Sequence, residues 1–191
     1  MKHIISGTNR PGSRSLQVAK VIQDLYREAG EETEIVDLQL MDLPGVVGHY
    51  GDTAPDVMKT AIEKINKSEG VIVVVPEYNG SYPGALKYFI DHWSYPHSFE
   101  WRPVCFVGIG WGFGGLRPVE HLQSVFGYRN AFIYPDRVFM IDAPKYVNDG
   151  KVENLGMYER LKNQVKGFQA FCKALSVAGL DANALKAKSK S

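Results

Sequence analysis

The sequence VIVVVPEYNGSYPGALK, residues 71–87, decides the fold of this chain. Its first five residues are all β-branched, which predicts a strand buried on both faces, as in the centre of a parallel sheet. Two prolines and two glycines then fix the course of a loop and let its backbone approach a ligand. In open α/β sheets, small molecules bind outside the carboxyl ends of such strands. We therefore expect residues 76–84 to form one wall of a ligand site.

A second loop of this kind lies close to the N-terminus. Residues 7–15, GTNRPGSRS, follow a short apolar strand and are rich in glycine, serine and threonine. An amphipathic helix follows them, with Ser13 or Ser15 available as its N-cap. The free amide groups and the positive dipole end of a helix start bind phosphate, and Thr8 and Arg10 add donors. We expect a phosphate site at this loop.

The rest of the chain continues the alternation of strands and helices. Strands are expected at 3–5, 34–38, 71–75, 104–109 and 132–140, the last broken at Pro135, and helices at 16–29, 55–65, 85–93, 116–126 and 154–178. This alternation predicts an α/β fold, a doubly wound five-stranded parallel sheet in the order 2-1-3-4-5 with helices on both faces. We expect a single domain over residues 1–180 and a disordered tail over 181–191.

Composition restricts the classes of function. The 22 basic and 21 acidic side chains give a formal charge of +1, so no overall field attracts nucleic acid or an anionic membrane surface. No apolar run reaches the roughly 20 residues that span a bilayer, and the N-terminus enters a strand without a signal peptide. We expect a cytoplasmic protein. Cys105 and Cys172 are expected to be buried thiols, and no cysteine or histidine spacing indicates a metal site.

A third glycine-rich loop, GWGFGG at 110–115, follows the strand at 104–109. In the order 2-1-3-4-5 the first and third strands are neighbours, so the loops at 7–15 and 76–84 face one crevice, which the third loop borders. The crevice suits a phosphorylated planar ligand, and no acid, base or nucleophile stands out in it. Transfer of a hydride between nicotinamide and flavin needs little else, because the cofactors carry the reactivity. The sequence therefore favours redox chemistry over hydrolysis.

These loops resemble the motifs of the NADPH-dependent FMN reductase family. Residues 7–13 are similar to its phosphate loop, 76–87 to its flavin loop and 113–117 to its third signature. The resemblance spans residues 1–139. It implies a flavodoxin-like fold, FMN reduced by NADPH or NADH, a small-molecule electron acceptor, and a homodimer or homotetramer.

The resemblance also assigns residues to the cofactor. The flavin carries the chemistry in this family, so no catalytic side chain is assigned. By position, the phosphate contacts would be Thr8, Arg10, Ser13 and Ser15, the isoalloxazine would be bordered by Pro76, Glu77, Tyr78, Asn79 and Gly80, and its other edge would be lined by backbone around Gly110 and Gly112.

Our leading hypothesis is an NAD(P)H-dependent, FMN-containing oxidoreductase that works by a ping-pong exchange. Nicotinamide would reduce the flavin and leave before a quinone, azo dye, metal oxyanion or free flavin takes the electrons. One rival is a flavodoxin-like electron carrier that serves a protein partner, although carriers usually have a strongly acidic surface, which a chain of charge +1 lacks. The other is a flavin-binding interaction module without turnover.

Several residues have two interpretations at this stage. Ile109 and Trp111 are larger than the residues usual before the glycine pair of the third signature, and Trp111 is either a wall of the pocket or a subunit contact. The aromatic run at 93–101 indicates an oligomer interface more than a substrate subsite. Glu77 is either a flavin contact or a carboxylate that serves a helix dipole or an interface.

Overall fold

A parallel sheet runs through the centre of the protein. The computed structural model describes residues 1–41, 43, 48 and 50–188. The sheet has the order β2-β1-β3-β4-β5, with β6 also paired to β4, and each pairing is parallel. This is the predicted flavodoxin-like order. The strands are β1 (Lys2–Ser6), β2 (Thr33–Asp37), β3 (Val71–Pro76), β4 (Pro103–Ile109), β5 (Phe132–Ile133) and β6 (Val138–Met140).

The fifth strand is split in two, as predicted. β5 pairs with the start of β4, at Pro103 and Val104, and β6 pairs with its end, at 107–109. Pro135 lies in the break. Proline has no N–H to donate to a sheet, which confines it to strand ends, edges and bulges.

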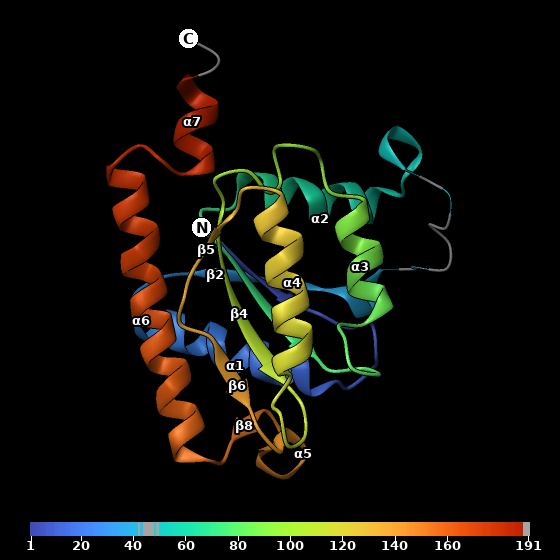
Figure 1. Cartoon of the computed structure of the whole chain (residues 1–191), viewed down its shortest axis with the longest axis vertical. Coiled ribbons are helices and arrows are strands. Elements are labelled where there is room, and N and C mark those ends of the chain that lie inside the picture. The colour runs from blue at the N-terminus through green and yellow to red at the C-terminus, as the bar shows by residue number, and fades with distance from the viewer. Residues whose placement is uncertain (42, 44–47, 49, 189–191) are drawn as a thin grey trace.

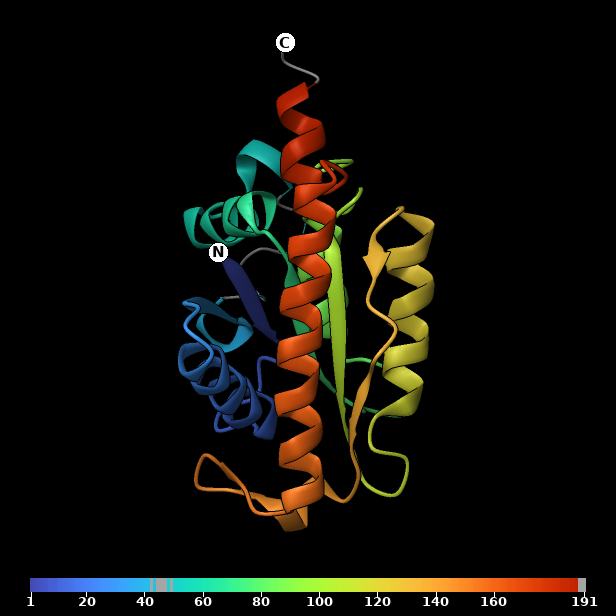
Figure 2. The same ribbon diagram turned by 90° about the vertical axis from the view of Figure 1, so that its left-hand side faces the viewer.

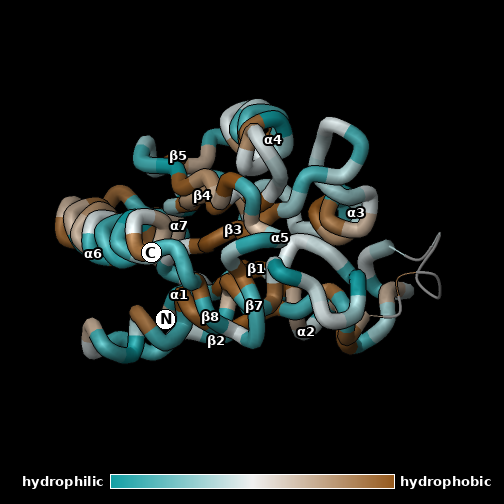
Figure 3. The backbone as a smooth tube through the Cα atoms, turned by 90° about the horizontal axis from the view of Figure 1, so that it is seen from below, coloured by the Kyte–Doolittle hydropathy of each residue, from teal (hydrophilic) through white to brown (hydrophobic). Residues whose placement is uncertain are grey.

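Helices cover both faces of the sheet because its strands are apolar on both faces. Within β1, Ile4 packs into one hydrophobic cluster and Ile5 into the other. The cluster around Ile4 includes side chains of the helices α1 (Arg14–Glu28) and α6 (Leu155–Val177). The cluster around Ile5 includes side chains of α2 (Asp56–Lys67), α3 (Gly84–Asp91) and α4 (Leu116–Tyr128). Figure 1 shows α3 and α4 in front of the strands and α6 at the left. Figure 2 turns this left side toward the viewer, so that α6 runs down the front of the molecule. In Figure 3 the strands form a mostly hydrophobic layer between the helices.

The connection between β6 and α6 contains structure that the sequence did not predict. It forms the short helix α5 (Ala143–Tyr146) and a hairpin of β7 (Val147–Asn148) and β8 (Lys151–Val152). Both lie at the lower end of the molecule in Figure 1, where β4 ends. The 3-10 turns η1 (Leu38–Leu40) and η3 (Gly51–Thr53) lie before and after the segment that contains residues 42, 44–47 and 49, which are not among the described residues.

Much of the aromatic run at 93–101 belongs to the core. Trp93 and Phe99 are each 6% exposed, and the Trp93 ring packs against Phe99 and Phe126. The interpretation of the whole run as an interface was therefore wrong. Tyr95 and Trp101 are the large aromatic side chains of this run that are exposed.

The chain end also differs from the prediction. Residues 182–188 form the helix α7 (Ala182–Lys188) instead of a disordered tail, while 189–191 lie outside the described residues. The Asp181 carboxylate caps this helix by accepting hydrogen bonds from the amides of Asn183 (2.8 Å) and Ala184 (3.1 Å). The prediction rested on the basic, small residues of this segment and did not take the N-cap at Asp181 into account.

A buried arginine ties together the segments that precede β3 and β4. Arg102 is 3% exposed, and its guanidinium donates to the carbonyl oxygens of Asn66 (3.0 Å), His97 (2.8 Å), Ser98 (3.0 Å) and Ser68. Burial lowers the pKa of Arg102 to about 10, so the group is still charged at neutral pH. Arg102 thus holds the amino edge of the sheet, where these strands begin.

Candidate functional site

A cavity of about 780 Å³ opens at the carboxyl ends of β1, β3 and β4. Figure 3 looks onto this edge of the sheet. We call it the carboxyl-edge cavity. It is lined by Thr8, Arg10, Pro11, Gly12, Ser13, Arg14, Ser15, Pro76, Glu77, Tyr78, Asn79, Ile109, Gly110, Trp111 and Pro144. The three loops that the sequence predicted to share a crevice therefore do meet there.

The first loop connects β1 to α1, and its backbone lies in close contact with β3. A Cβ on Gly7 would lie 2.7 Å from the carbonyl oxygen of Val74, so only glycine fits at this turn. Ser13 is the N-cap of α1, because its Oγ accepts the amide of Leu16 at 3.1 Å. The Ser13 hydroxyl hydrogen stays available for another acceptor. The start of α1 thus presents hydroxyl and amide donors to the cavity.

The second loop contains a tight turn of the Asn-Gly type. Tyr78 and Ser81 exchange backbone hydrogen bonds of 2.9 and 3.1 Å, and Asn79 and Gly80 between them have φ angles of 50° and 78°. Such positive φ values are those that asparagine and glycine tolerate best. The Thr8 hydroxyl donates to the Tyr78 hydroxyl at 3.1 Å, which joins the first loop to the second.

The third loop returns closely onto the end of β4. A Cβ on Gly115 would lie 2.4 Å from the amide nitrogen of Ile109, and one on Gly110 would lie 2.7 Å from the nitrogen of Gly115. The glycines are therefore needed for this close approach. Ile109 is 5% exposed and belongs to the core, whereas Trp111 is 63% exposed. The cavity stays open beside this large residue.

The carboxylate of Glu77 faces α4. Its Oε1 is 2.9 Å from a guanidinium nitrogen of Arg117, near the start of that helix. The same guanidinium lies 4.6 Å from the centre of the Phe113 ring. Arg117 thus links the second loop to the third. The Glu77 carboxylate forms its ion pair with a residue of the same chain.

Comparison with known proteins gives the assignment. The profile of the family described as NADPH-dependent FMN reductase matches residues 3–145, about three quarters of the chain. The chain belongs to this family.

Its curated relatives include two named reductases. An NADPH:quinone oxidoreductase of Arabidopsis thaliana is 27% identical over 175 residues, which covers 87% of this chain and 89% of that protein. An NADPH azoreductase of Bacillus sp. (strain OY1-2) is 28% identical over 150 residues, covering 78% and 80%. Among solved structures, FerB, a flavoenzyme NAD(P)H:(acceptor) oxidoreductase from Paracoccus denitrificans, has a TM-score of 0.70 at 24% identity, covering 91% and 97%. The last similarity supports the fold.

The carboxyl-edge cavity of this FMN reductase family member fits the FMN phosphate. Ser15 is 1% exposed, and its Oγ has no hydrogen-bond partner among the described residues. A buried hydroxyl without a partner is costly, so it indicates a missing acceptor. Arg10 on the same wall carries a positive charge, and the start of α1 adds backbone amides. This donor set suits a phosphate.

Most of the residues assigned by resemblance line the cavity. They are Thr8, Arg10, Ser13, Ser15, Pro76, Glu77, Tyr78, Asn79 and Gly110. Gly80 and Gly112 lie in the same loops but are not among the residues that line the cavity, so their assignment to the flavin stays a prediction. Gly80 is the second turn residue, and a Cβ there would lie 3.9 Å from Cδ of Arg117, whereas a Cβ on Gly112 would meet no described atom within 4 Å.

The sequence did not predict Pro144, which also lines the cavity. Its carbonyl oxygen accepts a hydrogen bond from Arg14 at 3.4 Å, across 130 positions of the sequence. Pro144 lies in α5, a four-residue helix in a segment without clear periodicity. No local pattern in the sequence signals such a contact.

The cysteines are buried and free, as predicted. Burial raises the pKa of Cys172 to about 12 and raises that of Cys105 as well, so neither thiol is ionised near neutral pH. Within the described residues, no group of three or more histidine, cysteine, aspartate or glutamate side chains is placed to hold a metal ion. In the same part of the chain, no helix combines the length and apolar character that crossing a membrane requires.

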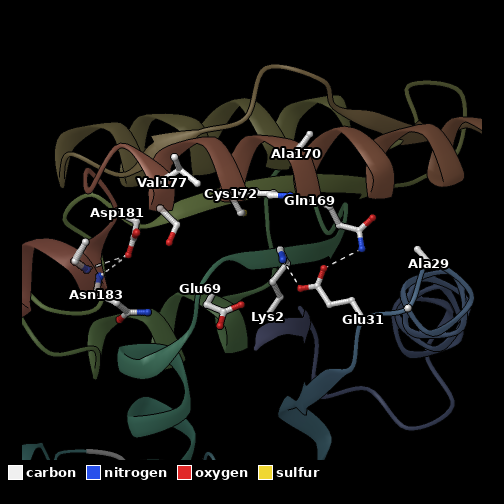
Figure 4. A pocket seen from close by; sticks show the side chains of 14 residues that line it. Lys2, Ala29, Glu31, Glu69, Gln169, Ala170, Cys172, Val177, Asp181 and Asn183 are labelled. Carbon is white, nitrogen blue, oxygen red and sulfur yellow. Dashed lines mark hydrogen bonds and ion pairs between the residues drawn. The ribbon is translucent and has the colours of Figure 1, made fainter.

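A second cavity of about 760 Å³ lies at the other end of the sheet. We call it the amino-edge cavity, and Figure 4 shows its lining side chains. The Lys2 ammonium forms an ion pair with Glu31, and Gln169 donates to the same carboxylate at 2.9 Å. Glu69 pairs with the N-terminal ammonium at 2.6 Å. These charged groups therefore already have partners within the protein.

Proposed function

We propose that this protein is an FMN-containing NAD(P)H-dependent oxidoreductase that works in two half-reactions. Nicotinamide reduces the bound cofactor and leaves, and an organic acceptor of the quinone or azo type then takes the electrons. The observation that carries the proposal is the carboxyl-edge cavity, where the start of α1 and the Ser15 hydroxyl, which has no partner among the described residues, lie together with residues 76–79 of the flavin-type loop. The names of the quinone and azo reductases above support the choice of acceptor.

Each loop has a defined task in this proposal. Thr8, Arg10, Ser13 and Ser15 hold the phosphate by charge-assisted hydrogen bonds. Residues 76–79 and the backbone at Gly110 border the ring system, in a position fixed by the Thr8–Tyr78 hydrogen bond. FMN, when bound, supplies the two-electron redox chemistry between nicotinamide and acceptor. The protein supplies binding, orientation and shielding from water.

We also propose that the protein is cytoplasmic and forms a homodimer or homotetramer. The two free, buried thiols are consistent with a reducing compartment. Tyr95 is 65% exposed and Tyr128 is 77% exposed, with the Arg129 guanidinium 4.5 and 4.8 Å from their ring centres. Aromatic and arginine side chains are enriched in protein interfaces, so this surface is our candidate for the subunit contact. Sedimentation equilibrium measures the assembly.

The test is the visible absorption spectrum of the purified protein. FMN is added to saturation, and NADPH or NADH is then added without oxygen. The proposal predicts a flavin band that bleaches at once and returns when a quinone is added. An electron carrier or an interaction module would also bind FMN, but NAD(P)H would leave the band of either in place. That result would reject the proposed function.

A further inference from the structure

Trp111 stands out on the wall of the carboxyl-edge cavity. Its side chain is 63% exposed, although its backbone is held on two sides. The Trp111 carbonyl oxygen accepts the amide of Gly114 at 2.8 Å and that of Asp142 at 3.2 Å. The preceding carbonyl, of Gly110, accepts the amide of Ala143 at 3.0 Å. The exposed indole is therefore presented by an ordered loop.

The neighbouring aromatic residue is placed differently. Phe113 is also largely exposed, at 61%, but the Arg117 guanidinium stacks on its ring. Among the described residues, no aromatic ring or cationic group stacks on the indole of Trp111. The cavity wall thus carries a large, electron-rich ring on which no aromatic or cationic group of the described residues is stacked. Its place in the lining of the cavity, rather than its exposure alone, makes the indole a candidate contact for a planar ligand.

We propose that Trp111 selects the electron acceptor by stacking on planar, electron-poor aromatic molecules such as quinones and azo dyes. This inference rests on the proposed function and narrows its acceptor class. The negative face of an indole attracts an electron-poor ring more strongly than an electron-rich one. Reduction of a quinone adds two electrons and two protons, and the resulting hydroquinone is electron-rich. Trp111 therefore favours the oxidised substrate over the reduced product, whereas a metal oxyanion offers it no ring.

Steady-state kinetics test this selection through a ratio. NADPH oxidation is measured with a planar quinone and with ferricyanide, which has no aromatic ring, and the two values of kcat/KM are divided. We expect the quinone-to-ferricyanide ratio to fall about fivefold to tenfold in Trp111→Ala, mainly through the KM for quinone, because one aromatic contact is lost. Trp111→Phe should recover most of the ratio. Trp101→Phe is the matched control, because Trp101 is exposed and lies outside the cavity lining.

A binding measurement without turnover gives a second readout. Oxidised, FMN-loaded protein is titrated with anthraquinone-2-sulfonate in the absence of NADPH, and tryptophan fluorescence is recorded. The quinone should quench a component that is lost in Trp111→Phe and kept in Trp101→Phe. Because this titration needs no electron donor, it tests the inference even if NADPH fails to reduce the flavin. That failure would overturn the proposed function alone.

Three results would overturn the role of Trp111. The first is an unchanged acceptor ratio in Trp111→Ala together with unchanged quenching in Trp111→Phe. The second is a loss of FMN affinity in Trp111→Ala as large as the loss in the acceptor ratio, which would place the indole against the cofactor. The third is a smaller assembly in sedimentation of Trp111→Ala, which would make Trp111 a subunit contact.

Discussion

The two ends of the sheet carry cavities of almost equal volume, about 780 Å³ at the carboxyl edge and about 760 Å³ at the amino edge. They differ in the state of their polar groups. At the amino edge, Lys2, Glu31 and Gln169 satisfy one another (Figure 4). At the carboxyl edge, the buried Ser15 hydroxyl has no partner among the described residues. A buried donor without a partner in the cavity lining, rather than volume, distinguishes the carboxyl-edge cavity. Thr33 Oγ1 and His3 Nδ1 also have no partner among the described residues, but neither lines the amino-edge cavity.

The comparison predicts that changes at the amino edge cost stability and spare FMN binding. The largest effect is expected for Arg102→Met. The loss of its guanidinium removes its hydrogen bonds to the carbonyl oxygens of Ser98, Asn66 and His97 at buried or partly buried places, so the free energy of unfolding should fall by about 3–5 kcal/mol. Urea unfolding of the FMN-free protein measures this loss. The matched control is Arg27→Met, a surface arginine of α1 whose side chain is 57% exposed, and an equal loss there would show that the buried contacts of Arg102 are unimportant.

A smaller loss is expected for Lys2→Met. Lys2 is 4% exposed, and its removal leaves the Glu31 carboxylate with the Gln169 side chain as its partner among the described residues. Unfolding in urea should become easier by about 1–3 kcal/mol, since an unpaired charge in a partly buried place is costly. The double variant Lys2→Met, Glu31→Leu should recover much of this loss. An altered dissociation constant for FMN in Lys2→Met would break the proposed separation of the two edges.

The smallest effect concerns acid stability. Burial lowers the pKa of His3 below 6.5, while Glu34, 3.7 Å from its Nε2, partly opposes the shift. The unfolded chain therefore takes up a proton that the folded protein resists. Stability should be complete above about pH 6.5 and should fall as the pH drops below it, by at most about 1.4 kcal/mol per pH unit for one proton.

His3→Asn is the variant that isolates this contribution. Urea unfolding between about pH 7.5 and 5.5 should give a flatter dependence on pH in His3→Asn than in the wild type. His97→Asn, at an exposed position, is the control. Identical pH profiles for the wild type and His3→Asn would show that another group carries the acid sensitivity.

The fold was largely predictable because its signals are local. The β-branched run at 71–75 marked a central strand, and Pro135 marked the break between β5 and β6. The errors arose where tertiary contacts decide the outcome. Trp93 and Phe99 are core residues because they pack against Phe126, which no pattern within 93–101 reveals.

The meeting of the loops around one cavity was predictable too, while the roles of their residues stay a prediction. The loops at 7–15 and 76–79 could be brought together from the strand order alone. Which residues of each loop line the cavity depends on the path of the backbone, which the sequence does not show. Gly80 and Gly112 lie in the predicted loops but not in the cavity lining, and Pro144, which lines the cavity and accepts a hydrogen bond from Arg14, lies 130 positions away in the sequence.

Ser15→Ala tests the central claim most directly, because its two predicted effects are separate. If the Ser15 hydroxyl donates to the FMN phosphate, its removal should weaken FMN binding by roughly 1.5–3 kcal/mol, about tenfold to a hundredfold in the dissociation constant. The FMN-free protein should be equally stable or slightly more stable, since a buried unpaired hydroxyl is gone. Ser13→Ala is the contrast, because the loss of the N-cap should cost the FMN-free protein about 1 kcal/mol. An unchanged FMN dissociation constant in Ser15→Ala, with a less stable FMN-free protein, would contradict the account.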